Sequence, residues 1–329
     1  MATQLEIPAP PPASRSGARD TRARRDSRAG LALVSPTVIV VFVMVVLPVI
    51  WALILSFQRI RLLQIRRLDL IGGEYTLRNY DLLLNSSGFL EAAKNTLLYS
   101  VFGTLGAIVL GLLAALLVRR SFRGRGLVRG VLLLPWVAPV VAIAFIWQVL
   151  LSPQLGFVNA VGTDVFGWDQ PIPFLSQESG TITLFGLGIG VPTALLMVIL
   201  FEAWKSFPFA FLFILARLQA VSGDIEEAAR VDGATPTQVF RHIILPQLAG
   251  VIALIAVLRF IWTFNAFDEI YLLTGGGAGT EVLATQVYSF LQARNDVGAS
   301  AAVAMFMAGV LAVLLLVYLK FFGERERTE

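Results

Sequence analysis

The side chains that could do chemistry lie inside long apolar stretches of the sequence. Glu202 and Lys205 lie three residues apart in one stretch, and Arg259 lies in the next. Ionisable residues in helices that are apolar enough to cross a membrane usually face the protein interior or a water-filled path. They can contact a polar solute, or they can be structural, with Glu202 pairing with Lys205 and Arg259 pairing with a neighbouring helix. The residue types leave both interpretations open.

A group of aromatic and amide side chains follows Arg259. It consists of Trp262, Phe264, Asn265 and Phe267. Planar polar side chains bind the hydroxyl groups of a sugar and aromatic rings bind its C–H faces, so this group offers both kinds of contact. Rings at helical spacing also occur in lipid-facing and core positions, and the spacing does not distinguish these roles.

The composition excludes most catalytic chemistry. The chain has no cysteine and one histidine, His242, which excludes cysteine nucleophiles, thiolate metal sites and histidine-rich metal centres. A phosphate-binding loop needs lysine directly after glycine. The lysines, none of which follows a glycine, are Lys94, Lys205 and Lys320. We therefore expect no catalytic residue, no metal site, no bound cofactor and no ATPase activity in this chain.

The scarcity of charge indicates a membrane protein. Of the 329 residues, 57% are hydrophobic and 15% are charged, whereas a soluble domain has about 25% charged residues. A helix of roughly 20 apolar residues crosses a bilayer, and helices satisfy every backbone amide there. The apolar stretches of that length are 31–57, 96–118, 131–151, 190–217, 246–271 and 299–321. The sequence predicts an all-α integral membrane protein with six transmembrane helices.

The positive charges predict the orientation. With six spans both termini share a side, and 17 of the 26 Lys and Arg residues lie on that side, against 7 on the other. The positive-inside rule makes both termini cytoplasmic, with tails 1–30 and 323–329, the first of them disordered, and it makes 58–95 an extracytoplasmic loop. Arginines of that loop that oppose the rule are Arg59, Arg61, Arg66 and Arg67. The net charge of +4 reflects this topology, so we expect no nucleic-acid partner.

The segment between the fourth and fifth predicted spans, 223–246, has the signals of two short helices. Asp224 can cap the first helix, with Glu227 three residues later, and Gly233 can adopt the left-handed conformation that ends it. The residues that mark the second start are Thr235 as cap, Pro236 at the first helical position and Gln238 at the third.

The same segment carries a spaced pattern: Glu-Ala-Ala, three residues, Gly, nine residues, Ile, one residue, Leu-Pro. The matching positions are Glu227, Ala228, Ala229, Gly233, Ile243, Leu245 and Pro246. This pattern resembles the coupling loop of membrane permease subunits of binding-protein-dependent ABC importers. The resemblance implies a type I importer permease in the bacterial plasma (inner) membrane, whose loop docks on a separate ATPase in the cytoplasm. The residues it assigns to coupling are Glu226, Glu227, Ala228, Ala229, Asp232, Gly233, Leu245 and Pro246.

Two further stretches of the sequence resemble permeases of known cargo class. The stretches 204–219 and 259–277 resemble the carbohydrate branch of these permeases, which includes maltose and multiple-sugar importers, and the likeness covers about 90–322. It implies a permease core at 96–322 that imports a sugar or oligosaccharide by alternating access. Side chains expected along the substrate pathway are Asn265, Trp262, Phe264, Phe267, Glu202 and Lys205.

The implied partners are a second permease subunit, two ATPase subunits that bind ATP and Mg, and an extracytoplasmic solute-binding protein. The alternatives are import of another solute by the same machinery (glycerol phosphate, a polyamine or a peptide), a proton-driven carrier, or an intramembrane enzyme.

Overall fold

The computed structural model describes residues 33–63, 75–184 and 187–322. The predicted tails 1–30 and 323–329 lie outside these residues. The chain divides into two compact units, Met1–Ile54 and Leu55–Glu329, which are described separately.

The described part of the first unit is helical. The helix Leu33–Ser56, which ends just inside the second unit, has a mean hydropathy of 3.2 over its most apolar window. A π-helical turn, η1 (Phe42–Val46), precedes α2 (Leu47–Ser56), whose second residue is Pro48. Proline has no N–H, and its ring clashes with the carbonyl four residues back. A wider π-helical turn before the proline removes this clash from the helix. The first predicted span is thus a helix at nearly its predicted limits.

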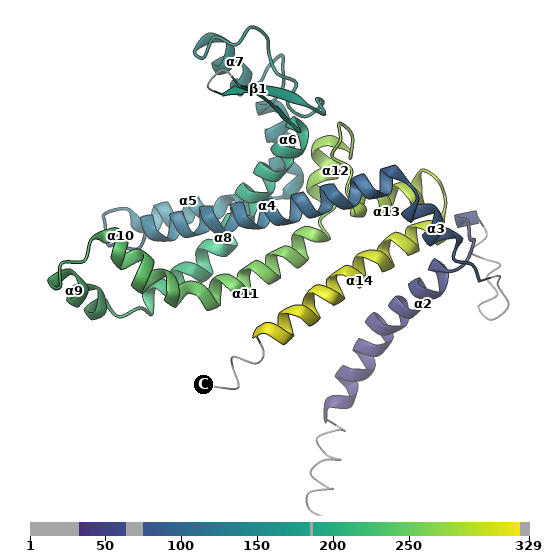
Figure 1. Cartoon of the computed structure of the whole chain (residues 1–329), viewed down its shortest axis with the longest axis horizontal. Coiled ribbons are helices and arrows are strands. Elements are labelled where there is room, and N and C mark those ends of the chain that lie inside the picture. Colours follow the sequence, from purple (N-terminus) through teal and green to yellow (C-terminus); the bar gives the residue numbers. More distant parts are fainter. Residues whose placement is uncertain (1–32, 64–74, 185–186, 323–329) are drawn as a thin grey trace, which may run out of the picture. The chain divides into compact units, whose positions relative to one another are not determined.

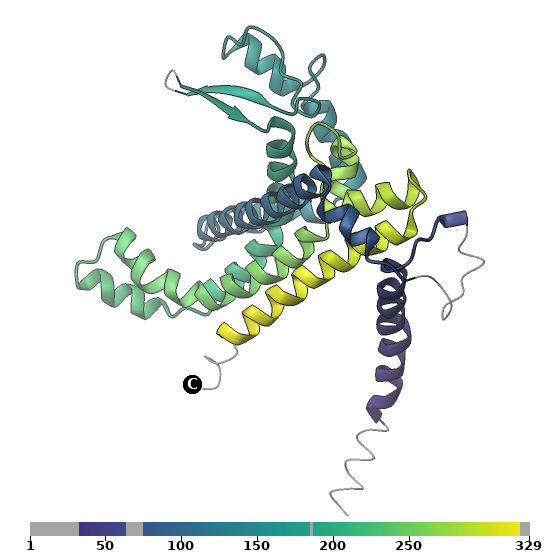
Figure 2. The same ribbon diagram turned by 45° about the vertical axis from the view of Figure 1, so that its right-hand side comes forward.

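The second unit is a set of helices with one small sheet (Figure 1). Its elements are α3 (Arg78–Leu84), α4 (Ser87–Leu117), α5 (Arg125–Val137), α6 (Val140–Leu150), α7 (Phe157–Asp164), β1 (Gly180–Leu184), β2 (Leu187–Val191), α8 (Thr193–Gln219), α9 (Gly223–Val231), α10 (Pro236–Val239), η3 (Phe240–Ile244), α11 (Leu245–Phe264), α12 (Asp268–Thr274), α13 (Leu283–Gln292) and α14 (Val297–Phe322). Figure 2 shows β1 and β2 as an antiparallel hairpin, in which Gly180 is paired with Val191. The all-α prediction is therefore wrong in this detail.

Helices α4, α8 and α11 pack together and form the centre of the second unit. Small residues let α4 and α8 approach closely, as in other membrane helix pairs. A Cβ atom placed on Gly111 of α4 would lie 2.7 Å from the Cβ of Ala210 and 2.7 Å from the backbone N of Phe211. Both α8 residues are fully buried in a large apolar cluster. Gly111 is therefore required by the packing.

Gly111→Leu is expected to destabilise the protein by about 1–3 kcal/mol, because the added side chain forces α4 and α8 apart. Thermal unfolding of the purified full-length protein in detergent measures this. The matched control is Gly250→Leu in α11, where an added Cβ has open space and leucine favours the helix by up to about 1 kcal/mol. Equal stability of the two variants would contradict the close contact.

The third predicted span, 131–151, is broken. Helices α5 and α6 meet at a 95° bend, and Ala138 at the break is extended, with ψ of 143°. A residue before proline is disfavoured in the helical region, and Pro139 follows Ala138. Among the described residues, five helices are long and apolar enough to cross a membrane, or six if this bent pair counts as one span.

The remaining span limits also differ from the prediction. Helix α4 starts already at Ser87, so the predicted loop 58–95 contains α3 and the first turns of α4. The fourth span begins at Thr193, because the residues before it form β2. The fifth predicted span, 246–271, ends at Phe264, where Asn265 donates its side-chain amide to the Ile261 carbonyl at 2.8 Å. Such local bonds compete with helix continuation.

Candidate functional site

The segment 223–246 forms helix, turn and helix. The cap of α9 is Ser222, whose Oγ accepts from the Asp224 backbone N–H at 3.3 Å, so the prediction of Asp224 as cap is wrong. Gly233 has φ of +81°. The turn has both bonds of a Schellman motif, Ala234 N–H to the Ala229 carbonyl at 2.9 Å and Gly233 N–H to the Arg230 carbonyl at 3.1 Å. The sequence prediction of a glycine-terminated helix is confirmed.

The start of α10 is also as predicted. The Thr235 Oγ1 accepts from the Gln238 backbone N–H, and the Gln238 side chain accepts from the Thr235 N–H at 2.8 Å. The helix then continues through η3 into α11, where Pro246 is the second residue. As before Pro48, the π-helical turn precedes a proline that cannot donate a backbone hydrogen bond.

Most of the predicted coupling residues are accessible. Glu227, Ala228, Asp232, Gly233 and Pro246 are exposed, whereas Ala229 and Leu245 are half-buried. Two apolar side chains of α9 are also exposed, Ile225 at 50% and Val231 at 83%. A short helix that presents carboxylates beside bare apolar side chains is typical of a protein docking surface.

Glu226 differs from its neighbours, because it is buried at 5% exposure. It forms ion pairs with Arg119, just after α4, and with Arg230 of α9. Burial, with smaller contributions from Arg120 and Arg230, lowers the pKa of the Arg119 guanidinium, which still remains charged at neutral pH. The structure thus places Glu226 under α9, where it ties this helix to the end of α4, and not on the exposed face with Glu227.

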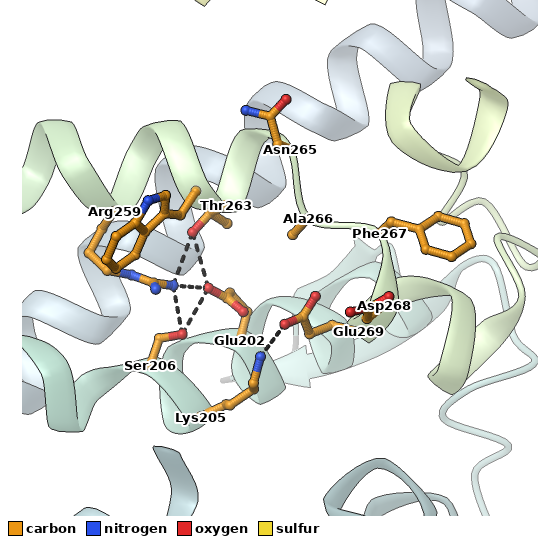
Figure 3. A pocket seen from close by; sticks show the side chains of 11 residues that line it. Glu202, Lys205, Ser206, Arg259, Thr263, Asn265, Ala266, Phe267, Asp268 and Glu269 are labelled. Atoms are coloured by element: carbon orange, nitrogen blue, oxygen red, sulfur yellow. Dashed lines mark hydrogen bonds and ion pairs between the residues drawn. The ribbon is translucent and has the colours of Figure 1, made fainter. Parts of the chain in front are cut away.

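A buried charge network connects α4, α8 and α11. Glu202 forms an ion pair with Arg259, and their side chains are 2% and 7% exposed. The Glu202 carboxylate also accepts from Ser206 and Thr263, each at 3.0 Å, and from the Tyr99 hydroxyl at 3.3 Å. Of the two interpretations open from the sequence, the pairing of Arg259 with a neighbouring helix is present in the structure (Figure 3).

The structural alternative in which Glu202 pairs with Lys205 is wrong. Lys205 instead forms an ion pair with Glu269 of α12. Glu202 and Lys205 are both on α8, but their side chains point in different directions. Glu202 faces α11, whereas Lys205 faces the chain that follows the end of α11 at Asn265 (Figure 3). Each cation therefore has its own carboxylate from another part of the fold, and the two pairs hold α8 to α11 and to α12.

A cavity of about 310 Å³ opens beside these ion pairs. Its lining residues are Glu202, Lys205, Ser206, Arg259, Trp262, Thr263, Asn265, Ala266, Phe267, Asp268 and Glu269. Five of the six predicted pathway residues are in this set. The sixth, Phe264, is 4% exposed and lies in a core cluster instead. The Asn265 side chain points away from the ion pairs in Figure 3.

Two aromatic residues, Trp262 and Phe267, line the cavity. Trp262 is 49% exposed and packs on Phe209 with ring centroids 5.1 Å apart. Phe267 stacks on Tyr271 at 4.9 Å and lies 5.0 Å from Tyr288. Sequence reasoning missed Tyr288, because it did not predict α13. The apolar spacing within 283–292 was the signal that could have revealed this helix.

The helices, the buried charges and the cavity define a multi-pass membrane protein, and comparison with solved structures gives its fold. The chain is similar to a chain of a bacterial ABC transporter involved in the import of the acidic polysaccharide alginate. The TM-score is 0.74 at 23% identity, covering 92% of this chain and 98% of that chain.

Sequence comparison shows the family. The family model of the inner membrane component of binding-protein-dependent transport systems matches residues 107–325, and the chain belongs to this family. The inner membrane ABC transporter permease protein YcjO of Escherichia coli is 30% identical over 294 residues, which are 89% of this chain and 94% of the relative. The trehalose/maltose permease protein MalF of Thermococcus litoralis is 30% identical over 298 residues, 90% and 94% of the two chains. The trehalose permease protein SugA of Mycobacterium tuberculosis is 30% identical over 311 residues, 94% and 92%.

Proposed function

We propose that this chain is the permease subunit of an ATP-driven importer that moves an uncharged sugar or oligosaccharide into the cytoplasm. It works with a second permease subunit, two ATPase subunits that bind ATP and Mg, and an extracytoplasmic solute-binding protein in the bacterial plasma membrane. The chain itself has no catalytic role. The observation that carries the proposal is the combination of a polar, ring-bounded cavity with an exposed, capped segment 223–246 in one chain of this family.

The charges of the cavity favour an uncharged cargo. Its two cations, Lys205 and Arg259, are each paired with a carboxylate of the protein. Asp268, which also lines the cavity, is exposed and has no ion-pair partner among the described residues. An anionic solute would find no free cation here and would meet Asp268. A neutral sugar fits the amide, hydroxyl and ring groups, and two relatives bear names of trehalose and maltose permeases.

Coupling to the ATPase is proposed to run through α9. The exposed face of α9 meets the ATPase subunit, and the Glu226 ion pair passes its movement to the end of α4, which packs against α8 and α11. The proposed cycle is one of alternating access. The proposed topology has six spans, counting the bent pair α5 and α6 as one span, and both termini are therefore in the cytoplasm. The rigid α4–α8 contact carries the motion to the cavity.

The function is tested by uptake of labelled sugars into vesicles that contain the assembled importer and its binding protein. We expect uptake to require ATP and to favour neutral over acidic oligosaccharides. Uptake driven by a proton gradient without ATP would contradict the proposal.

Asn265→Ala is expected to lower the apparent affinity or rate of uptake by about threefold to tenfold, the equivalent of one lost hydrogen bond to the cargo. The matched control is Asn85→Ala, because Asn85 also ends a helix and donates to the carbonyl four residues back, at 2.9 Å, but lies outside the cavity. Equal uptake by the two variants would show that Asn265 only caps its helix.

A further inference from the structure

A second cavity lies at the start of α14, away from the sugar site and the coupling segment. It has a volume of about 440 Å³, and its lining residues are Arg59, Ile60, Arg61, Arg78, Asn79, Leu82 and Asp296. Figure 1 shows α3, which contributes Arg78, beside the start of α14. The proposed import function gives this group of arginines no role.

Backbone hydrogen bonds fix the walls of this cavity. The Ile60 carbonyl accepts from the Val297 and Gly298 N–H groups at 3.0 and 3.3 Å, and the Leu62 N–H donates to the Asn295 carbonyl at 2.9 Å. The segment that carries Arg59 and Arg61 is therefore held against the start of α14. The Asn79 side chain donates to the Ser56 and Gln58 carbonyls, each at 2.9 Å, and fixes α3 to the same segment. The arginines thus project from a preorganised backbone.

The cavity has an excess of positive charge. It is lined by three arginines and one carboxylate, Asp296, and that carboxylate already accepts from the Ala299 N–H at 2.9 Å. In the part of the chain that the structure describes, neither Arg59 nor Arg78 has an ion pair. Two such guanidinium groups can each bind a phosphate through parallel N–H donors.

The position of the cavity favours a lipid over a free anion. The apolar helix α14 begins one residue after Asp296, which places the arginines at headgroup depth if α14 spans the bilayer. Arg78 and Leu82 are four residues apart and lie on one face of α3. A guanidinium group that can bind a lipid headgroup is therefore next to an apolar side chain that can contact the lipid chains. Leu82 is 56% exposed, and the neighbouring Leu77 is 68% exposed.

We propose that this cavity binds the phosphate of an anionic phospholipid, with Arg59, Arg61 and Arg78 around the phosphate and Leu82 against the lipid chains. On the proposed topology these arginines face the extracytoplasmic leaflet, where the positive-inside rule disfavours them. A bound lipid phosphate supplies a counter-charge for Arg59 and Arg78, by the same attraction that holds lipid head groups in basic pockets between membrane helices.

The test is native mass spectrometry of the full-length protein, purified in detergent and titrated with phosphatidylglycerol or phosphatidylcholine. We expect retention of phosphatidylglycerol by the wild type and a several-fold loss in the double variant Arg59→Gln, Arg78→Gln. The matched control is Arg123→Gln, Arg241→Gln, which removes two exposed arginines outside the cavity and should keep the lipid. Arg59→Lys, Arg78→Lys should retain an intermediate amount, since it keeps the charge without the guanidinium.

Unchanged thermal unfolding of the Gln variant shows that lipid loss does not reflect misfolding, as expected for two exposed side chains. Equal lipid retention by the Gln variant and its control would overturn the proposal. Displacement of the lipid by inorganic phosphate at equal concentration would assign the site to a free anion instead. Loss of solute-binding-protein association with full lipid retention would assign the arginines to a protein interface.

Discussion

Arg259→Met is expected to destabilise the folded protein by about 3–5 kcal/mol, because it leaves the Glu202 carboxylate buried without its cation. Glu202 is 2% exposed, so its carboxylate has little contact with solvent that could replace the guanidinium. The hydroxyl groups of Tyr99, Ser206 and Thr263 remain as donors, but neutral donors do not offset a buried negative charge. The measurement is thermal unfolding of the purified full-length protein at fixed detergent concentration.

The double variant Glu202→Gln, Arg259→Met should regain most of this loss, since replacing both partners of a buried ion pair is often close to neutral. The control is Arg217→Met, an exposed arginine on α8, the helix that carries Glu202. It removes only an exposed hydrogen bond to the Gln247 carbonyl, so a change of no more than about 1.5 kcal/mol is expected. A single Arg259→Met variant with wild-type stability would contradict a buried ion pair. Uptake by a stable double variant then reports whether the pair contributes to transport as well as to folding.

Glu227→Lys is expected to abolish uptake and to reduce co-purification of the ATPase subunits more than about tenfold, the effect of reversing one charge of an interface pair. Glu227 is exposed and has no ion-pair partner among the described residues, so the fold should stay intact. Gly233→Trp should have the same effect on uptake. At φ of +81° tryptophan costs about 1–2 kcal/mol relative to glycine, and the indole adds bulk to the turn.

The matched control is Asp169→Lys, which makes the same charge change on an exposed residue of the segment between α7 and β1. This variant should keep ATPase association and unfold at the same temperature as the Glu227→Lys variant. Normal uptake by both the Glu227→Lys and Gly233→Trp variants would refute the role of α9 in coupling. If either variant failed to insert into the membrane, its loss of uptake would reflect a folding defect, and the other variant would then decide whether α9 has a role in coupling.

The sequence alone was sufficient for most features that depend on neighbouring residues, although it predicted Asp224 as the cap of α9 where the cap is Ser222. The scarcity of charge predicted a membrane protein, and the apolar stretches located most of the long helices, because the bilayer length and backbone hydrogen bonding impose the same requirement on each. The turn at Gly233 and the cap at Thr235 were predicted correctly, since each bond joins residues at most five positions apart. The sequence prediction of one continuous span over 131–151 missed the break at Ala138, although the signal for it, the proline that follows, is local.

Only the tertiary structure decided the partners of the buried charges and the shape of the cavity. Glu202 and Lys205 are close in sequence, yet each pairs with a residue more than 50 positions away. The choice depends on which helix α8 packs against, and that depends on small residues such as Gly111 and Ala210 that let α4 and α8 approach. Tyr288 contacts Phe267 and Tyr271 only in the folded chain, because it lies on a separate helix, α13. Such pairings follow from long-range packing, which residue types and spacing along the chain do not specify.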